Sequence, residues 1–437
     1  MGRRKVFPLQ ISVKADALQE NDAQNLVRLT QHALDDHNDF SGHHLRLQLA
    51  PKESSTDDDS HVALTIQLTP GESNSASLDS DSAVLNIAYP PNTVPSSSSS
   101  SSTLATYIAN ELQSTFVEEQ SIISYLLSTS SAPDAKPPRP KPRDGRPTIE
   151  ANHTIPAICA DAAIEEYMKP MLDILGPIHN FTIDTQVQLY ATPGAQSQVL
   201  SKDDLASFIN AAEWPLSPSI GGAPTVNFVI YVGDQKIGLD SEAGTSSQSW
   251  MFPQWGSVYL LKLPETTAHV SAETLKQPML TFNGHLLSLL GTPQSGSLPL
   301  RLSTLSRIRS ADLLLQASST LGSLARLSLA LPSIAIPRSV ADGVASTMEH
   351  LQQACSNLGD PSGLLHARIA EEEAERAFFE KSMVGQLYFP DEHKIAVYLP
   401  LLGPVGVPLV MGLVNELRGW IRRRRQRAKD AGEKKTQ

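Results

Sequence analysis

Histidine and glutamate side chains are the groups in this 437-residue sequence whose spacing first suggests metal chemistry. His43 and His44 are adjacent and follow His37, and imidazole nitrogens are common metal ligands. Their neighbours are more typical of a loop that enters a strand, which is the simpler interpretation. Three consecutive glutamates at 371–373 lie on an expected amphipathic helix, where we predict a solvated charged face and not a metal site.

Two cysteines, Cys159 and Cys355, are too few to form a disulfide framework, a zinc site or an iron–sulfur site by themselves. They either pair once in an oxidising compartment or remain buried thiols. A nucleophilic Cys159 would need an adjacent base. His153 and His179 are near it in sequence, but nothing in the sequence identifies either as that base.

The patterns that mark common active sites are missing from the sequence. It contains no G-x-S-x-G, Walker A, Rossmann glycine, H-E-x-x-H or C-x-x-C pattern. We therefore expect no catalytic residue, no bound metal and no cofactor.

Three aromatic residues, Trp250, Phe252 and Trp255, are closely spaced in the segment WMFPQWG. One interpretation is local core packing beside a strand. The other is a partner contact, because Trp and Phe are enriched at protein interfaces. Two N-glycosylation sequons begin at Asn152 and Asn180, although a chain of this length contains about two by chance.

The elements that must position these residues follow an α/β order. Residues 7–13 and 225–232 alternate or are β-rich and predict strands, and the second run should lie centrally in a sheet. We expect an α/β region with a mixed sheet and flanking helices, followed by a C-terminal transmembrane helix. The predicted segments are 1–127 (first α/β segment), 128–147 (Pro-rich linker or insertion), 148–265 (second α/β segment), 266–394 (helical segment), 395–417 (transmembrane helix) and 418–437 (basic cytoplasmic tail).

The transmembrane prediction depends on residues 395–414, which read IAVYLPLLGPVGVPLVMGLV and carry no charge. Twenty residues are about enough for a helix to cross the hydrocarbon of a bilayer. Tyr398 and Trp420 suit the two membrane interfaces, and the arginines at 422–425 should stay cytoplasmic. The alternative is a buried core helix or an apolar loop.

Prolines 400, 404 and 408 recur every four residues, so Pro400, Pro404 and Pro408 lie roughly on one helix face. Each lacks an N–H, so a carbonyl four residues earlier loses its usual partner. An unsatisfied carbonyl is costly in hydrocarbon. We therefore expect this face to contact another helix, a polar lipid group or water, and not acyl chains. Docking against multispanning partner subunits is the interpretation that we prefer to a plain anchor.

Charge is unevenly distributed. The net charge is −11, but the residues from Arg418 onward contain nine Lys/Arg and two Asp/Glu, so the remainder carries −18. An acidic body argues against nucleic-acid binding, and the basic tail suits anionic lipid headgroups. No apolar signal region follows Met1, which by itself predicts a tail-anchored protein with a cytosolic body. The arginine cluster predicts the opposite orientation, so we expect either tail anchoring or a missing N-terminal signal anchor.

Several short segments, in this order, resemble the PIG-S family, a subunit of the GPI transamidase complex of the endoplasmic reticulum, in a fungal-like form. They cover nearly the whole chain. The segments are FPLQI at 7–11, HALDD at 32–36, HHLRL at 43–47, VNFVIYV at 226–232, FPQWG at 252–256, TLGSL at 320–324, ERAFF at 375–379, YFPDEHK at 388–394 and AVYLPL at 396–401.

The resemblance implies a lumenal α/β region between two membrane spans, in a complex that replaces a C-terminal signal with a preformed glycolipid anchor. Catalysis would belong to a caspase-like cysteine-protease subunit, and the other partners would be PIG-T-like, PIG-U-like and metallopeptidase-like subunits. This chain would be a noncatalytic subunit in the endoplasmic reticulum membrane. It departs from the family in lacking the N-terminal span. The other hypotheses are a membrane-anchored lumenal hydrolase and a tail-anchored cytosolic adaptor that uses its Pro-rich segment.

Overall fold

A computed structural model provides the structure of the chain. It describes all residues except 1–6, 38–41, 51–61, 97–98, 131–147, 155–159, 187–192, 196, 210–224, 239–246, 254, 264–269, 333–334, 359–360, 384–390 and 434–437. Side chains are not described for 130, 148–154, 361, 391–396, 401 and 426–433.

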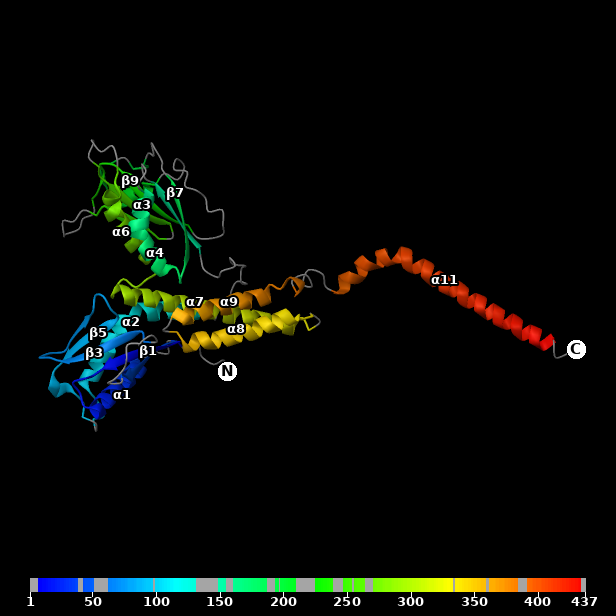
Figure 1. Cartoon of the computed structure of the whole chain (residues 1–437), viewed down its shortest axis with the longest axis horizontal. Helices are drawn as coiled ribbons and strands as arrows, with labels where there is room; N and C mark the ends of the chain where they lie inside the picture. The colour runs from blue at the N-terminus through cyan, green and yellow to red at the C-terminus, as the bar shows by residue number, and fades with distance from the viewer. Residues whose placement is uncertain are drawn as a thin grey trace.

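The first part of the chain forms a five-stranded mixed sheet covered by two helices (Figure 1). The strand order is β2 (His43–Leu49), β1 (Phe7–Lys14), β3 (Leu64–Pro70), β5 (Val84–Tyr89) and β4 (Ser75–Leu78). Only the β4–β5 pair is antiparallel among these strands. Alternate strand residues such as Ile11, Ile66 and Ile87 are buried with α1 (Glu20–His37) and α2 (Thr103–Ser130), as the period of two in a half-buried strand requires.

The second part forms another five-stranded mixed sheet. Its order is β11 (Ser249–Phe252), β12 (Gly256–Leu261), β9 (Thr225–Val232), β6 (Thr148–Thr154) and β7 (Asn180–Gln186). The pair β11–β12 is antiparallel and the other pairs are parallel. Its helices are α3 (Ala160–Ala163), a π-helical turn (Ile164–Met168), α4 (Lys169–Leu175), α5 (Lys202–Ser207) and α6 (Ala272–Leu289), and a short pair joins β8 (Val199–Leu200) to β10 (Lys236–Ile237).

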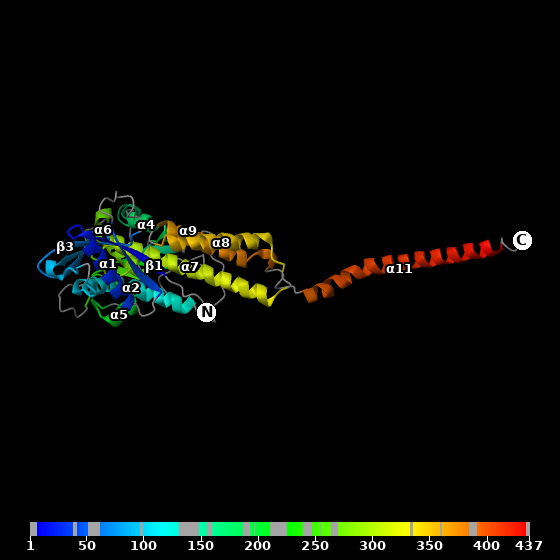
Figure 2. The same ribbon diagram turned by 90° about the horizontal axis from the view of Figure 1, so that it is seen from below.

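Three long helices follow the second sheet: α7 (Leu298–Ala330), α8 (Arg338–Ser356) and α9 (Pro361–Phe378). They lie side by side in both views (Figures 1 and 2). Helix α7 also contacts α2 of the first part. The last helix, α11 (Asp391–Glu433), extends away from this body (Figure 2).

The fold confirms the α/β class and the mixed sheets. It also confirms 225–232 as a central strand, because β9 lies between β12 and β6. The short strands β4 and β6 were not predicted, since β4 is a four-residue edge strand and β6 follows directly on the Pro-rich segment. The solvated face predicted for the glutamates is wrong at Glu371, which is buried.

Among the residues that the structure describes, no helix combines the length and the apolar character that crossing a membrane requires.

Candidate functional site

A buried ionic network lies between α2, α7 and β2. Glu119 of α2, Arg307 of α7 and His43 of β2 are 1%, 3% and 5% exposed. Arg307 donates from Nε to Glu119 Oε1 over 2.9 Å and from Nη2 to Oε2 over 2.7 Å. Thr304 donates its hydroxyl to Oε2 over 3.1 Å, and His43 Nε2 lies 3.5 Å from Oε1. The carboxylate of α2 thus contacts two other elements, α7 and β2, that are distant from it in sequence.

The electrostatics of the network keep Glu119 ionised. Burial by itself raises the pKa of this carboxyl group, but the charge of Arg307 opposes it. The hydrogen bonds from Arg307 act in the same direction as its charge, and the resulting pKa is about 2. A carboxyl group with so low a pKa remains a carboxylate at neutral pH, so it serves as an anchor and not as a proton donor.

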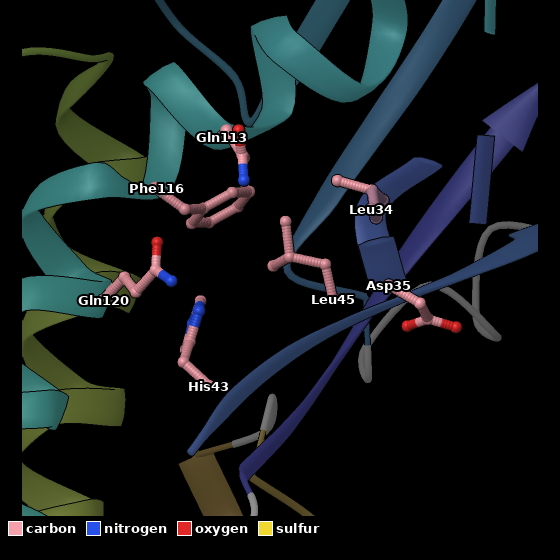
Figure 3. A pocket seen from close by; sticks show the side chains of 7 residues that line it. All are labelled: Leu34, Asp35, His43, Leu45, Gln113, Phe116 and Gln120. Carbon is pink, nitrogen blue, oxygen red and sulfur yellow. The ribbon is translucent and has the colours of Figure 1, made fainter. Parts of the chain in front are cut away.

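Figure 3 shows a small pocket beside this network, between α1, α2 and β2. Its free volume is about 20 Å³, which is room for about one water molecule. The imidazole of His43 points toward Gln120 and Phe116, whereas the carboxylate of Asp35 points away from them (Figure 3). The pocket is lined by Leu34, Asp35, His43, Leu45, Gln113, Phe116 and Gln120. No organic substrate fits so small a space, so we interpret the network as a structural joint.

The metal interpretation of the histidines is not supported by their positions. His43 faces Glu119, and His37 ends α1. Within the described part of the chain, no group of three or more His, Cys, Asp or Glu residues is arranged to hold a metal ion. His350 and His366 bring their Nδ1 atoms to 2.9 Å between α8 and α9, but two nitrogen ligands without a third do not make a zinc site.

A serine–histidine pair lies in the second sheet and bears on the hydrolase hypothesis. Ser257 Oγ is 2.5 Å from His285 Nδ1 and donates to the carbonyl of Trp250 over 3.1 Å. When the hydroxyl donates its proton to the Trp250 carbonyl, the imidazole can only donate its own N–H to Oγ, which is the reverse of a general base. Ser257 is also 0% exposed, so a substrate cannot reach it. Sequence reasoning missed this pair because its members are 28 positions apart and follow no motif.

The sequence candidates around Cys159 lie partly outside the described residues, because Cys159 itself is not described. His153 is in β6, and its side chain is not described. His179 is 8% exposed, and burial, together with the charges of Arg309 and Arg368, lowers its pKa to about 4. Cys355 is a free thiol on an exposed residue, so the prediction of a buried thiol is wrong there.

The aromatic residues of the WMFPQWG segment contact one another in succession, edge-on, beside the second sheet. Trp250 is 9% exposed and meets the ring of Phe208 edge-on at 5.1 Å. Phe252 lies 6.3 Å from Trp250 and 5.8 Å from Trp255, again edge-on. Trp250 therefore belongs to the core. Phe252 and Trp255 are half-buried at its margin, where a partner contact stays a prediction.

The residue after Trp255, Gly256, has a backbone conformation that favours glycine. Its φ is +146°, and a Cβ atom placed there would lie 1.9 Å from the carbonyl oxygen of Asn227. Asn227 in turn donates its backbone N–H and its side-chain amide to the carbonyl of Trp255, over 2.9 and 3.2 Å. Only glycine permits this approach.

The two sequons occupy neighbouring parallel strands. Asn152 is in the interior of β6, paired with β7 on one side and β9 on the other, and its side chain is not described. Asn180 begins β7, which is an edge strand, and it is half-buried while Thr182 is exposed. Asn180 therefore lies at the edge of the sheet, where its strand has a partner on one side only.

The three prolines lie inside α11, where Pro400, Pro404 and Pro408 are part of a continuous helix. The described apolar side chains around them are exposed on all sides, for example Leu399 at 68%, Leu402 at 63% and Val405 at 61%. Water does not favour such a surface.

Comparison with known proteins places these features in a family context. A family model described as "Phosphatidylinositol-glycan biosynthesis class S protein" matches residues 2–423. The Schizosaccharomyces pombe protein "GPI transamidase component PIG-S homolog" is 30% identical over 298 residues, 63% of this chain and 53% of the relative. The Homo sapiens protein "GPI-anchor transamidase component PIGS" is 28% identical over 293 residues, 58% of this chain and 53% of the relative. The chain spans about half the length of the curated relatives it matches.

Proposed function

Because this chain belongs to the phosphatidylinositol-glycan biosynthesis class S (PIG-S) family, we propose that it is a noncatalytic subunit of the GPI transamidase complex. In this role it supports the attachment of preformed GPI anchors to the C-termini of precursor proteins in the endoplasmic reticulum. The observation that carries the proposal is the match over residues 2–423. Relatives named as GPI transamidase components agree with it.

The partners in this proposal are a caspase-like catalytic subunit and PIG-T-like, PIG-U-like and metallopeptidase-like subunits. Affinity purification of the chain in mild detergent, followed by mass spectrometry, tests this directly. These subunits should be recovered together, in similar amounts. Recovery of the chain without any of them would refute membership of the complex.

The noncatalytic role rests on the missing active-site patterns and on the burial of Ser257. Replacing Cys159 or Cys355 with Ser should leave anchor transfer unchanged once complex abundance is normalised. A large loss of turnover at normal abundance would show that the chain supplies a nucleophile.

We place the chain in the membrane through residues 395–417 of α11. Residues 395–414 carry no charge, and the described apolar side chains of this helix are exposed around its whole circumference. A helix that is apolar on all sides is typical of a lipid environment. The side chains of 391–396 and 401, which belong to the same stretch, are outside the described residues. The arginines at 422–425 favour a cytoplasmic tail and a lumenal body.

The orientation can be tested in sealed microsomes. Glycosidase treatment of the full-length protein should shift its mobility through Asn180 or Asn152. A tag added after Gln437 should be digested by external protease while the body is protected. A digested body with a protected tag would reverse the proposed orientation.

We further propose that the face formed by Pro400, Pro404 and Pro408 docks against membrane helices of partner subunits. Gly403 and Gly406 remove bulk nearby and permit a close approach, since a Cβ placed on either meets nothing within 4 Å. Replacing residues 395–414 with a Leu/Ala helix of equal length should anchor the chain but reduce assembly. Normal assembly and anchor attachment would leave only the anchoring role.

Phe252 and Trp255 are the proposed partner contacts of the lumenal body. Trp255→Ala should release partner subunits while the melting temperature of the chain stays unchanged. A lowered melting temperature with partners retained would favour local packing. Phe282→Ala is a suitable comparison, because Phe282 is fully buried and should lower the melting temperature.

A further inference from the structure

An exposed apolar tip joins α7 to α8. Its described members are Leu329, Leu331 and Ile336, whose exposed fractions are 80%, 38% and 52%. Scattered single apolar residues are common on surfaces, but three at one turn form a patch that suits a contact.

The charged residues that flank the tip in the sequence are both arginines. From 327 to 337 the chain contains no ionisable residue, and the nearest charged residues on either side are Arg326 and Arg338. Both arginines are exposed. An apolar group flanked by exposed arginines is complementary to a surface that is apolar within and anionic outside, which describes the headgroup region of a bilayer.

The tip lies at the end of the body from which α11 departs. Leu324 of α7, Val340 of α8 and Ala377 of α9 form one buried cluster with Met383, so the C-terminal end of α9 packs beside the tip. Helix α11 begins at Asp391, only eight residues beyond Met383. Eight residues span at most about 28 Å even when fully extended. The start of α11 and the tip are on the same side of the body in Figures 1 and 2.

We propose that the α7–α8 tip is a second membrane contact, in which Leu329, Leu331 and Ile336 enter the interfacial region of the lumenal leaflet. Arg326 and Arg338 then lie at the level of the lipid phosphates. The inference rests on the proposed membrane location of α11. Two attachment points, one spanning and one peripheral, restrict the tilt of the lumenal body relative to the bilayer, which a single helical anchor with a connecting segment does not do.

The test uses the full chain, with Cys159 and Cys355 replaced by Ser, in vesicles of phosphatidylcholine and phosphatidylserine. A single NBD fluorophore is attached through Leu329→Cys. The comparison variant carries the same label through Leu365→Cys, because Leu365 is 50% exposed near the start of α9, at the opposite end of the bundle. A third variant, Leu409→Cys, reports on α11, where Leu409 is 69% exposed.

Lipids with a nitroxide near the headgroup should quench most of the NBD emission at position 329 and little at position 365. Adding Leu331→Glu and Ile336→Glu to the Leu329→Cys variant should abolish that quenching. Quenching by aqueous iodide instead of lipid nitroxide at position 329 would overturn the proposal. Protection from both quenchers would also overturn it, in favour of a protein contact such as a second copy of the chain.

The probe at position 409 separates this inference from the proposed span. Quenching at 409 by nitroxide deep in the acyl chains, without quenching at 329, would retain the span and reject the tip contact. Absence of quenching at 409 would reject the span, and the probe at 329 would still decide whether the tip binds lipid.

Discussion

Removing the positive charge of Arg307 from the buried network should destabilise the protein strongly. In Arg307→Met, Glu119 loses the two hydrogen bonds of 2.9 and 2.7 Å while it remains 1% exposed. Breaking a buried ion pair by removing one partner costs about 3–5 kcal/mol. The pKa gives a consistent figure, because lowering it from 4.5 to about 2 corresponds to about 3 kcal/mol of stabilisation of the carboxylate.

Urea unfolding of the purified chain in detergent, followed by circular dichroism, measures this cost. Arg376→Met is the matched control, because Arg376 makes a similar contact with Glu372 and Glu373 but is 62% exposed. An exposed pair of this kind contributes about 0–1 kcal/mol. The double variant Glu119→Leu/Arg307→Met should recover most of the loss, since apolar residues of similar volume can replace a buried ion pair.

The pH dependence provides an independent check. The folded-state pKa of Glu119 is below its unfolded value, so its contribution is present above about pH 4.5 and is lost as the pH falls toward 2. Arg307→Met should flatten the stability profile in this window. Arg307→Met should lower the unfolding free energy more than Arg376→Met does, and the double variant should be more stable than Arg307→Met. Failure of either expectation would refute a structural role for the buried network.

Three further changes test other parts of the structure. Gly256→Ala places a Cβ atom 1.9 Å from the carbonyl oxygen of Asn227 at a φ of +146°, so it should cost at least about 2 kcal/mol in urea unfolding; wild-type stability would contradict the close approach. The pKa of His179 is lowered to about 4 in the folded chain, so between pH 6.5 and 4 this imidazole binds a proton in the unfolded chain but not in the folded one. The unfolding free energy should therefore decrease as the pH is lowered through that range. His179→Gln should reduce that fall, and an unchanged profile would show that other groups cause it. Cys355→Ser should change the unfolding free energy by less than about 0.5 kcal/mol, because the residue is exposed, and a larger loss would indicate a buried structural thiol.

Local patterns were sufficient to predict the main elements. The segment at 7–13 became β1, and the β-rich run at 225–232 became β9. Both strands bury apolar side chains, so the local pattern of apolar residues reports directly on the burial. The errors arose where the local signal was weak, as in β4, or where a charged run did not reveal its surroundings, as at Glu371.

The polar contacts were not predictable from spacing. Glu119 and Arg307 are 188 positions apart, and neither belongs to a motif. Their pairing depends on the packing of α7 against α2, which brings two charges into a site from which water is excluded. The same is true of Ser257 and His285, whose roles depend on which group receives the hydroxyl proton.

The sequence by itself determined the α/β class, the strands at 7–13 and 225–232, the uncharged stretch at 395–414 and the family resemblance, because each of these depends on local composition or on the order of short segments. The tertiary structure alone decided that Trp250 is a core residue, that His43 faces a carboxylate and that the exposed tip of α7 and α8 lies beside the C-terminal end of α9. These facts depend on which distant elements share a surface, and burial, pKa and accessibility are properties of that shared surface and not of the residues taken singly.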